Sequence, residues 1–176
     1  MDKKILRQKI RNQRKVIAAQ DALIAGEFLL KQLIDLLNAS HKIAIYHASA
    51  GEIDVQPIIE YCLANDKEVY QAIAWKTVRE MRFERIYDSQ PQQMFVDADY
   101  ELKQEIKCYN LDLVILPLIA IDNHGYRLGQ GGGYYDTTFA SPEERPILCG
   151  VGYEWQMQDS VPCDEWDKPL DYFASE

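Results

Sequence analysis

Two segments near the N-terminus carry hydrophobic residues at helical spacing. In residues 2–18 the apolar side chains recur at loosely helical spacing among basic ones, which predicts an amphipathic helix with a cationic polar face. Residues 22–37 carry a broader apolar stripe, which predicts a second helix with a large buried face. The polar residues 38–41 are expected to end this second helix.

Most of the remaining hydrophobic runs are short and predict strands. Strands are predicted at residues 42–46, 67–73, 111–119 and 146–151, with an edge or hairpin strand at residues 81–87. Helices are predicted at residues 55–65, opened by Asp54, and at residues 134–140. The run Leu113–Leu116 is continuously apolar, as is typical of a strand buried on both faces of a parallel sheet. We therefore expect the α/β class, a three-layer α/β/α sandwich around a mostly parallel sheet, as a single domain over residues 1–176.

The composition is that of a water-soluble globular protein. Of 176 residues, 47% are hydrophobic and 27% charged, and no stretch approaches the roughly 20 consecutive apolar residues of a membrane span. Seven of the first fifteen residues are Lys or Arg, which does not fit the uncharged core of a secretory signal. The four cysteines form no C-x-x-C pair, as is typical of reduced, mostly buried thiols. We therefore expect a cytoplasmic protein that engages no membrane.

The charge is unevenly distributed along the chain. The net charge is −9, but residues 1–20 carry seven basic residues and one acid, so they hold +6 and the other residues hold −15. This asymmetry predicts an anionic partner for the N-terminal segment. An acidic body would repel an extended polyanion, so nucleic-acid binding is not expected, and a small anion such as a nucleotide phosphate fits better.

A glycine cluster provides the second feature that suits phosphate. Five of the nine glycines lie in residues 125–133, where backbone N–H groups can approach a ligand closely and a helix is expected to follow. The segment is neither a Walker A loop nor a G-x-G-x-x-G fingerprint, because Tyr134 occupies the last position of the latter. A flexible surface loop is the alternative interpretation. Tyr134, Tyr135 and Asp136 follow directly and offer ring faces for a planar substrate and a carboxylate for a metal.

These residues closely resemble the signature of the 5-formyltetrahydrofolate cyclo-ligase family. The matching residues are Asp112–Pro117, Asp122 and Gly125–Asp136. Three further segments match in the same order along the chain: Lys3–Arg7 the family's K-x-x-L-R opening, Gly51–Asp54 an E-[IV]-[DN] segment of its folate pocket, and Val161–Asp167 with Pro169–Asp171 its C-terminal element. The resemblance therefore covers nearly the whole chain.

The resemblance implies a fold, a reaction and its substrates. The fold is that of the sugar-phosphate isomerase and coenzyme A transferase group. The reaction is the ATP- and Mg²⁺-dependent cyclisation of 5-formyltetrahydrofolate to 5,10-methenyltetrahydrofolate, with release of ADP and phosphate. The formyl oxygen attacks the γ-phosphate to give a phosphorylated imidate, and N10 then closes the ring. Partners are these small molecules, and a monomer is expected.

The same resemblance implies which residues form the site. The nucleotide site is assigned to Lys3, Lys4, Arg7, Arg127, Leu128, Gly129, Gln130, Gly131, Gly132, Gly133, Tyr134 and Tyr135, with Arg11 assisting. The folate site is assigned to His47, Glu52, Met81, Gln130, Gly131, Gly132, Gly133 and Tyr134. Asp136 and Asp167 are the expected Mg²⁺ ligands, and Asp136, Tyr134 and Arg127 the expected catalytic residues. Glu52 is expected to accept hydrogen bonds from the flat edge of the pterin.

The chain departs from the family pattern at several places. Gln130 stands where the family commonly has Arg or Lys, which removes one cationic phosphate contact. Trp166 replaces a His that many relatives have, and Phe95–Asn110 contains no G-x-x-E-P segment. Tyr172–Ser175 replaces the usual valine-threonine ending.

Two other functions fit the same scaffold. One is a sugar-phosphate isomerase-like activity that needs no ATP, and the other is non-catalytic binding of reduced folate. ATP-dependent turnover distinguishes the cyclo-ligase from both, because fold alone does not determine function.

Overall fold

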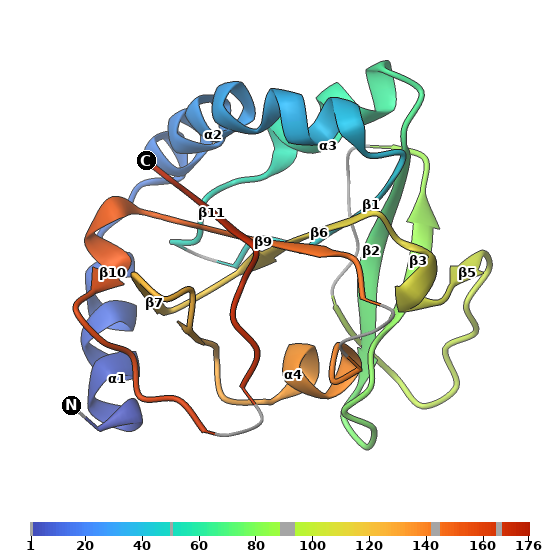
Figure 1. The fold of residues 1–176 in the computed structure, drawn as a ribbon. Helices are drawn as coiled ribbons and strands as arrows, with labels where there is room; N and C mark the ends of the chain where they lie inside the picture. Colours follow the sequence, from blue (N-terminus) through green and yellow to red (C-terminus); the bar gives the residue numbers. More distant parts are fainter. Residues whose placement is uncertain (1, 50, 89–93, 142–144, 165–166) are drawn as a thin grey trace.

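The chain forms one large mixed sheet with helices on both of its faces (Figure 1). The computed structural model describes residues 2–49, 51–88, 94–141, 145–164 and 167–176. The helices are α1 (Lys3–Arg14), α2 (Ala19–Ala39), α3 (Gln56–Ala64) and α4 (Tyr134–Thr138), with 3-10 turns η1 (Cys108–Asn110) and η2 (Glu154–Gln156). The strands of the large sheet are β1 (Lys42–Ile45), β2 (Glu68–Trp75), β3 (Arg82–Ile86), β4 (Phe95–Val96), β5 (Glu105–Ile106), β6 (Leu113–Pro117), β9 (Ile147–Gly152) and β11 (Tyr172–Ser175).

The large sheet contains a point at which the strand order reverses. Its order is β11-β9-β6-β1-β2-β3-β5, with β4 paired to β2. The central pairs are parallel, and only the β2–β3 and β3–β5 pairs are antiparallel. From β1 the chain continues outward to β2, whereas from β6 it continues in the opposite direction to β9. Open α/β sheets bind ligands at the carboxyl ends of the strands at such a reversal, so the β1–β6 crevice is the expected place for a site.

A second, small sheet connects helix α1 to the large one. It consists of β7 (Ala120–Asp122), β8 (Arg127–Leu128) and β10 (Met157–Gln158), in the order β10-β7-β8. Leu6 and Ile10 of α1 are buried against this sheet, in a cluster with Ile119, Leu128 and Val161. Strand β8 leads directly into the glycine loop, defined here as residues 129–133. The small sheet therefore places α1 and the glycine loop side by side.

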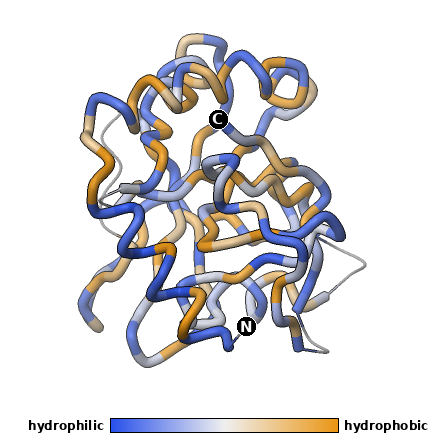
Figure 2. Tube along the Cα trace, turned by 90° about the vertical axis from the view of Figure 1, so that its left-hand side faces the viewer, coloured by the Kyte–Doolittle hydropathy of each residue, from blue (hydrophilic) through white to orange (hydrophobic). Residues whose placement is uncertain are grey.

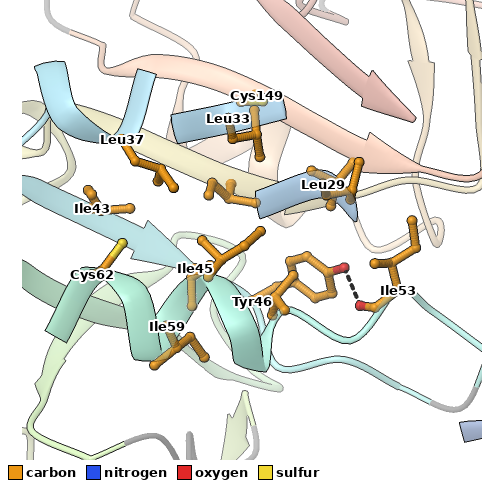
Figure 3. Close-up of a cluster of buried hydrophobic side chains, with 14 of the residues drawn as sticks. Leu29, Leu33, Leu37, Ile43, Ile45, Tyr46, Ile53, Ile59, Cys62 and Cys149 are labelled. Carbon is orange, nitrogen blue, oxygen red and sulfur yellow. Dashed lines mark hydrogen bonds between the residues drawn. The ribbon is translucent and has the colours of Figure 1, made fainter. Parts of the chain in front are cut away.

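Helices α2 and α3 cover the face of the sheet opposite α4 (Figure 1). Their apolar sides share a core cluster with residues of β1 and β9, and Figure 3 shows Leu29, Leu33, Ile45 and Cys149 among its members. Hydrophilic and hydrophobic residues alternate along the helices, as Figure 2 shows, so each helix presents an apolar side to the core. Tyr46, just after β1, donates a hydrogen bond of 2.7 Å to the Ile53 carbonyl, and this bond fixes the segment that carries Glu52.

The sequence-based fold prediction is confirmed in class and layering, with local corrections. The first helix ends at Arg14 rather than residue 18, since Ala18 is extended and α2 begins at Ala19. The last predicted helix is a single turn that ends at Thr138. All four cysteines are free, but only Cys62 and Cys149 are buried; burial raises the pKa of both thiols to about 12. None of the described helices is long and apolar enough to cross a membrane.

Candidate functional site

A large cavity lies at the carboxyl ends of β1 and β6, where the strand order reverses. Its volume is about 1410 Å³. Its walls come from α1, the segment after β1, the glycine loop, α4 and the β2–β3 turn, together with Asp164, Asp167 and Lys168. Pockets for one small ligand usually measure roughly 300–1,000 Å³, so this cavity has room for two substrates at once.

Helix α1 lines one wall with a row of cations. Lys3, Arg7, Arg11, Arg14 and Lys15 all face the cavity. The Arg7 Nε donates to the Gly129 carbonyl at 2.9 Å, and the Arg11 Nη2 donates to the Gln130 carbonyl at 3.0 Å. Two arginines therefore hold the glycine loop against the helix while their charge faces the cavity.

Lys4 does not belong to this row. It is exposed and does not line the cavity. Successive residues of an α-helix are rotated by roughly 100°, so Lys4 points away from the direction that Lys3 and Arg7 share. The spacing of Lys3, Arg7 and Arg11 is the signal that separates the two groups in the sequence.

The glycine loop adopts conformations that only glycine takes easily. Gly131 has φ of 106° and Gly133 has φ of 71°. A Cβ at Gly131 would lie 3.4 Å from the Arg7 Cζ, and one at Gly133 would lie 3.6 Å from the Arg79 Nη1. The loop is therefore flanked by a guanidinium on each side. Because α4 has only five residues, the groups of this loop that could bind an anion are these cations and its backbone N–H groups rather than a helix dipole.

Arg127 joins the loop to the C-terminal segment. This buried guanidinium donates through Nη2 to the Asp136 Oδ1 at 2.8 Å and through Nη1 to the Lys168 carbonyl at 3.0 Å. Its Cζ lies 6.0 Å from the centre of the Tyr135 ring. Burial raises the pKa of the Tyr135 phenol well above its ordinary value, so the ring stays neutral beside the cavity. Through these hydrogen bonds Arg127 links β8 to α4 and to Lys168.

Lys3 holds two further carboxylates at the cavity wall. Its Nζ lies 2.7 Å from the Asp164 Oδ2 and 3.3 Å from the Asp167 Oδ2. Partial burial alone would lower the pKa of Lys3, but the hydrogen bonds to Asp164 and Asp167 and their negative charges raise it above its ordinary value. The backbone N–H of Asp164 also donates to the Asp167 Oδ2 at 2.8 Å.

Three aspartates at the cavity are the carboxylates that could act as metal ligands. Asp136, Asp164 and Asp167 all line the cavity. Within the residues that the structure describes, no three His, Cys, Asp or Glu residues are grouped as ligands of one ion. Mg²⁺ is usually held by one or two carboxylates together with substrate phosphates and water. The donors Asp136 and Asp167 therefore suit an ion that arrives with a nucleotide.

Glu52 lies on a second wall of the cavity, which meets helix α1 at the ion pair between Glu52 and Arg14. Only 5% of the residue is exposed. Its Oε1 accepts from the Arg14 Nη1 at 3.1 Å and from the Gln130 Nε2 at 3.0 Å, while its Oε2 accepts from the Ser49 N–H at 2.9 Å. The carboxylate is thus fixed in position and faces the cavity.

Aromatic and exposed polar groups complete this wall. The Tyr134 ring packs edge to face on Phe95, with centroids 5.3 Å apart. His47 is exposed and lines the cavity directly after β1. Met81 does not reach the cavity; its side chain is 3% exposed and lies in the core cluster that also contains Phe83. The assignment of Met81 to the folate site is corrected accordingly, because the chain enters β3 with this side chain turned inward.

Several cavity residues have no clear signal in the sequence. Four residues line the cavity although the matched motifs assign them no role: Arg79, Lys15, Phe95 and Asp164. Only the spacing of Asp164 and Asp167 hints at an acidic pair. Trp166, where the chain departs from many relatives, lies outside the described residues.

Comparisons with known proteins agree along the whole chain. The model of the 5-formyltetrahydrofolate cyclo-ligase family matches residues 1–176. The chain is 28% identical over 146 residues to 5-formyltetrahydrofolate cyclo-ligase of Escherichia coli (strain K12), covering 74% of this chain and 75% of that protein. It is 27% identical over 173 residues to the Haemophilus influenzae enzyme of that name, covering 94% and 92% of the two chains.

A solved structure supports the same assignment. The NMR structure of Aquifex aeolicus 5,10-methenyltetrahydrofolate synthetase has a TM-score of 0.79 to this chain at 27% identity, covering 99% of this chain and 90% of that one. The similarity thus includes α1, the glycine loop and the C-terminal segment that meet at the cavity. Because the family model, the relatives and the solved structure agree over both walls of the cavity, the chain belongs to the 5-formyltetrahydrofolate cyclo-ligase family of ligases.

Proposed function

We propose that the chain catalyses the ATP-dependent cyclisation of 5-formyltetrahydrofolate to 5,10-methenyltetrahydrofolate, with release of ADP and phosphate, and that residues 1–176 act as one domain. The observation that carries this proposal is the two-sided cavity. One wall is cationic and glycine-rich, and the other carries the buried carboxylate of Glu52 and the ring of Tyr134. A reaction between a nucleotide and a pterin needs both walls at once.

The nucleotide is placed at the α1 wall. Lys3, Arg7 and Arg11 lie within reach of phosphates bound at the glycine loop, and their charges offset the charge of the polyphosphate. Phosphoryl transfer depends mainly on positioning and on neutralising charge that spreads over the transferred group. Gln130 supplies no cation, so the loop relies on its backbone N–H groups and on Arg11 at this point.

The pterin is placed at the Glu52 wall. Its flat edge carries N–H donors that suit a carboxylate acceptor, and Tyr134 and Phe95 offer a ring contact for the aromatic part of folate. This places the formyl group near the boundary between the two walls. The formyl oxygen attacks the γ-phosphorus and ADP leaves; N10 then attacks the activated carbon, loses its proton and displaces phosphate.

Asp136 and Asp167 are the side chains that would hold Mg²⁺. The ion supplies charge neutralisation at the β- and γ-phosphates when it is bound. Arg127 and Lys3 orient these carboxylates through their hydrogen bonds. These hydrogen bonds therefore orient the two carboxylates toward the proposed phosphate site even without a bound ion. A cytoplasmic location and a monomeric state stay predictions.

The test is the appearance of methenyltetrahydrofolate by its near-ultraviolet absorbance. Purified protein is incubated with 5-formyltetrahydrofolate and Mg²⁺, with and without ATP. Product that forms only with ATP supports the cyclo-ligase. A folded protein that binds both ligands without product would instead act as a reduced-folate binder. A protein whose melting temperature does not respond to nucleotide would point to an isomerase-like activity.

A further inference from the structure

The side chain of Gln130 connects the two walls of the cavity. Its Oε1 accepts hydrogen bonds from Arg11, at 2.9 Å from Nη2 and 3.3 Å from Nε, and its Nε2 donates to the Glu52 Oε1 at 3.0 Å. An amide can accept at one end and donate at the other, whereas Arg and Lys side chains only donate. The bridge Arg11–Gln130–Glu52 therefore depends on the residue by which this chain departs from the common family pattern.

On the pterin side, the bridge occupies a place that a substrate needs. Each carboxylate oxygen accepts about two hydrogen bonds. The Glu52 Oε1 already has two donors, Arg14 and Gln130, and Oε2 has one, the Ser49 N–H. A pterin edge that donates a hydrogen bond to both Glu52 oxygens needs one free acceptor position on each oxygen. Arg14 is buried and also donates to the Leu118 carbonyl, so the exposed Gln130 is the donor that can give way.

On the nucleotide side, the bridge occupies the guanidinium of Arg11. Three of the hydrogen bonds that this side chain makes go to Gln130, two to the amide oxygen and one to the carbonyl. These bonds use the Nε and Nη2 edge of the guanidinium, and a phosphate that approaches this edge from the glycine loop would compete for the same N–H groups. Both Arg11 and Gln130 are exposed, so they can exchange partners without disturbing the core.

We propose, on the basis of the proposed function, that Gln130 is a positioning residue that couples the two substrate sites. Either substrate competes with one end of the bridge, and the substrate that binds second meets a bridge that is already open. ATP and 5-formyltetrahydrofolate therefore each raise the affinity for the other. Such coupling is reciprocal by linkage, so the two affinities change by the same factor.

The test measures this coupling factor directly. The Kd of 5-formyltetrahydrofolate is determined by titration calorimetry with Mg²⁺, in the absence and presence of a saturating non-hydrolysable ATP analogue. The wild-type Kd is expected to fall by roughly fivefold or more, within the usual range of coupling between sites. The Kd of the analogue, measured with and without the folate, should fall by the same factor.

Two variants separate the bridge from a general structural role. Gln130→Met keeps the length of the side chain but removes its donor and acceptor, and it should bring the coupling factor close to one. A merely structural role would weaken both ligands and leave the ratio of affinities unchanged. Gln8→Met is the matched control, because Gln8 lies on α1 outside the cavity and its side chain donates to the Asn12 Oδ1 at 3.0 Å; it should keep the wild-type factor.

The outcomes distinguish this proposal from the proposed function. If both ligands bind but a coupling factor of one is found for the wild type, or if Gln130→Met keeps the coupling, the proposed role of Gln130 is rejected. The proposed cyclo-ligase activity is not affected by that result. If the protein binds only one ligand or neither, the proposed function fails and the bridge fails with it. A factor that is present in the wild type and Gln8→Met, and lost in Gln130→Met, supports the bridge.

Discussion

Replacing Arg14 with methionine tests whether a buried ion pair fastens helix α1 over the cavity. Arg14 is 5% exposed, and its Nη1 lies 3.1 Å from the Glu52 Oε1. Its Nη2 donates to the Leu118 carbonyl. Methionine can fill much of the same space but carries no charge. The variant therefore leaves the Glu52 carboxylate buried with hydrogen bonds from Gln130 and Ser49 but without a cation.

The expected loss follows from burial. Removing one partner of a buried pair costs about 3–5 kcal/mol, because the other charge stays desolvated. For a chain of this size, 1 kcal/mol corresponds to roughly 2–4 °C in Tm, so Arg14→Met should melt about 6–20 °C lower. Adding Glu52→Gln removes the stranded charge, and the double variant should recover about 1–3 kcal/mol of interaction energy. Arg11→Met is the matched control, since an exposed arginine contributes about 1 kcal/mol or less.

Urea unfolding followed by far-ultraviolet circular dichroism measures these free energies. The three variants and the wild type are compared with a common m-value, since a changed m-value would indicate a different unfolded or native state. An Arg14→Met variant that loses less than about 1 kcal/mol would refute the reasoning, as would a double variant no more stable than Arg14→Met alone. In either case α1 would be held chiefly by its apolar contacts.

Three other predictions address the chemistry and the pH dependence. Asp136→Asn should lower kcat by on the order of a hundredfold, because it removes a proposed metal ligand at the cavity wall; near-normal steady-state turnover at saturating Mg²⁺ would reject that role. Lys3→Met should raise the KM for ATP more than that for 5-formyltetrahydrofolate, whereas Lys4→Met should alter neither, and equal effects of the two would contradict the placement of Lys3. Burial alone would raise the pKa of Asp171, but hydrogen bonds from Arg145 and from a backbone N–H lower it. The stability that wild type gains over Asp171→Asn should therefore be present above the pKa of roughly 3.9 of an unfolded Asp and be lost as the pH falls further, and urea titrations from pH 7 to 3 would show no such convergence if the pairing were unimportant.

The central layers of the fold were predictable because their signals are local. A continuous apolar run such as Leu113–Leu116 indicates a strand covered on both faces, and this strand, β6, lies next to β1 at the reversal of strand order. The small sheet was not predictable. Its strands have two or three residues, and Met157 pairs with Ile121 from a distant part of the sequence. No periodicity can be read from segments so short.

The candidate site also has parts that could be predicted from the sequence and parts that could not. The row Lys3, Arg7 and Arg11 follows from helical spacing, and the glycine loop from composition. The partners of Glu52 could not be predicted from the sequence, because its buried ion pair with Arg14 depends on how α1 packs against the segment after β1. Met81 was misplaced for the same reason, since the register of β3 decides which side chains turn into the core.

Helix α1 carries buried apolar residues on one side and cations on an adjacent side. This arrangement accounts for the concentration of positive charge near the N-terminus. Leu6 and Ile10 are buried against the small sheet, while Lys3, Arg7 and Arg11 face the cavity on an adjacent side of the helix. The apolar contacts keep the cations close together although they repel one another. Because the rest of the chain is acidic, we expect most of the surface to repel a large polyanion, whereas a nucleotide would be small enough to interact with the basic row alone. We therefore expect the charge pattern to favour a small anion over a large one.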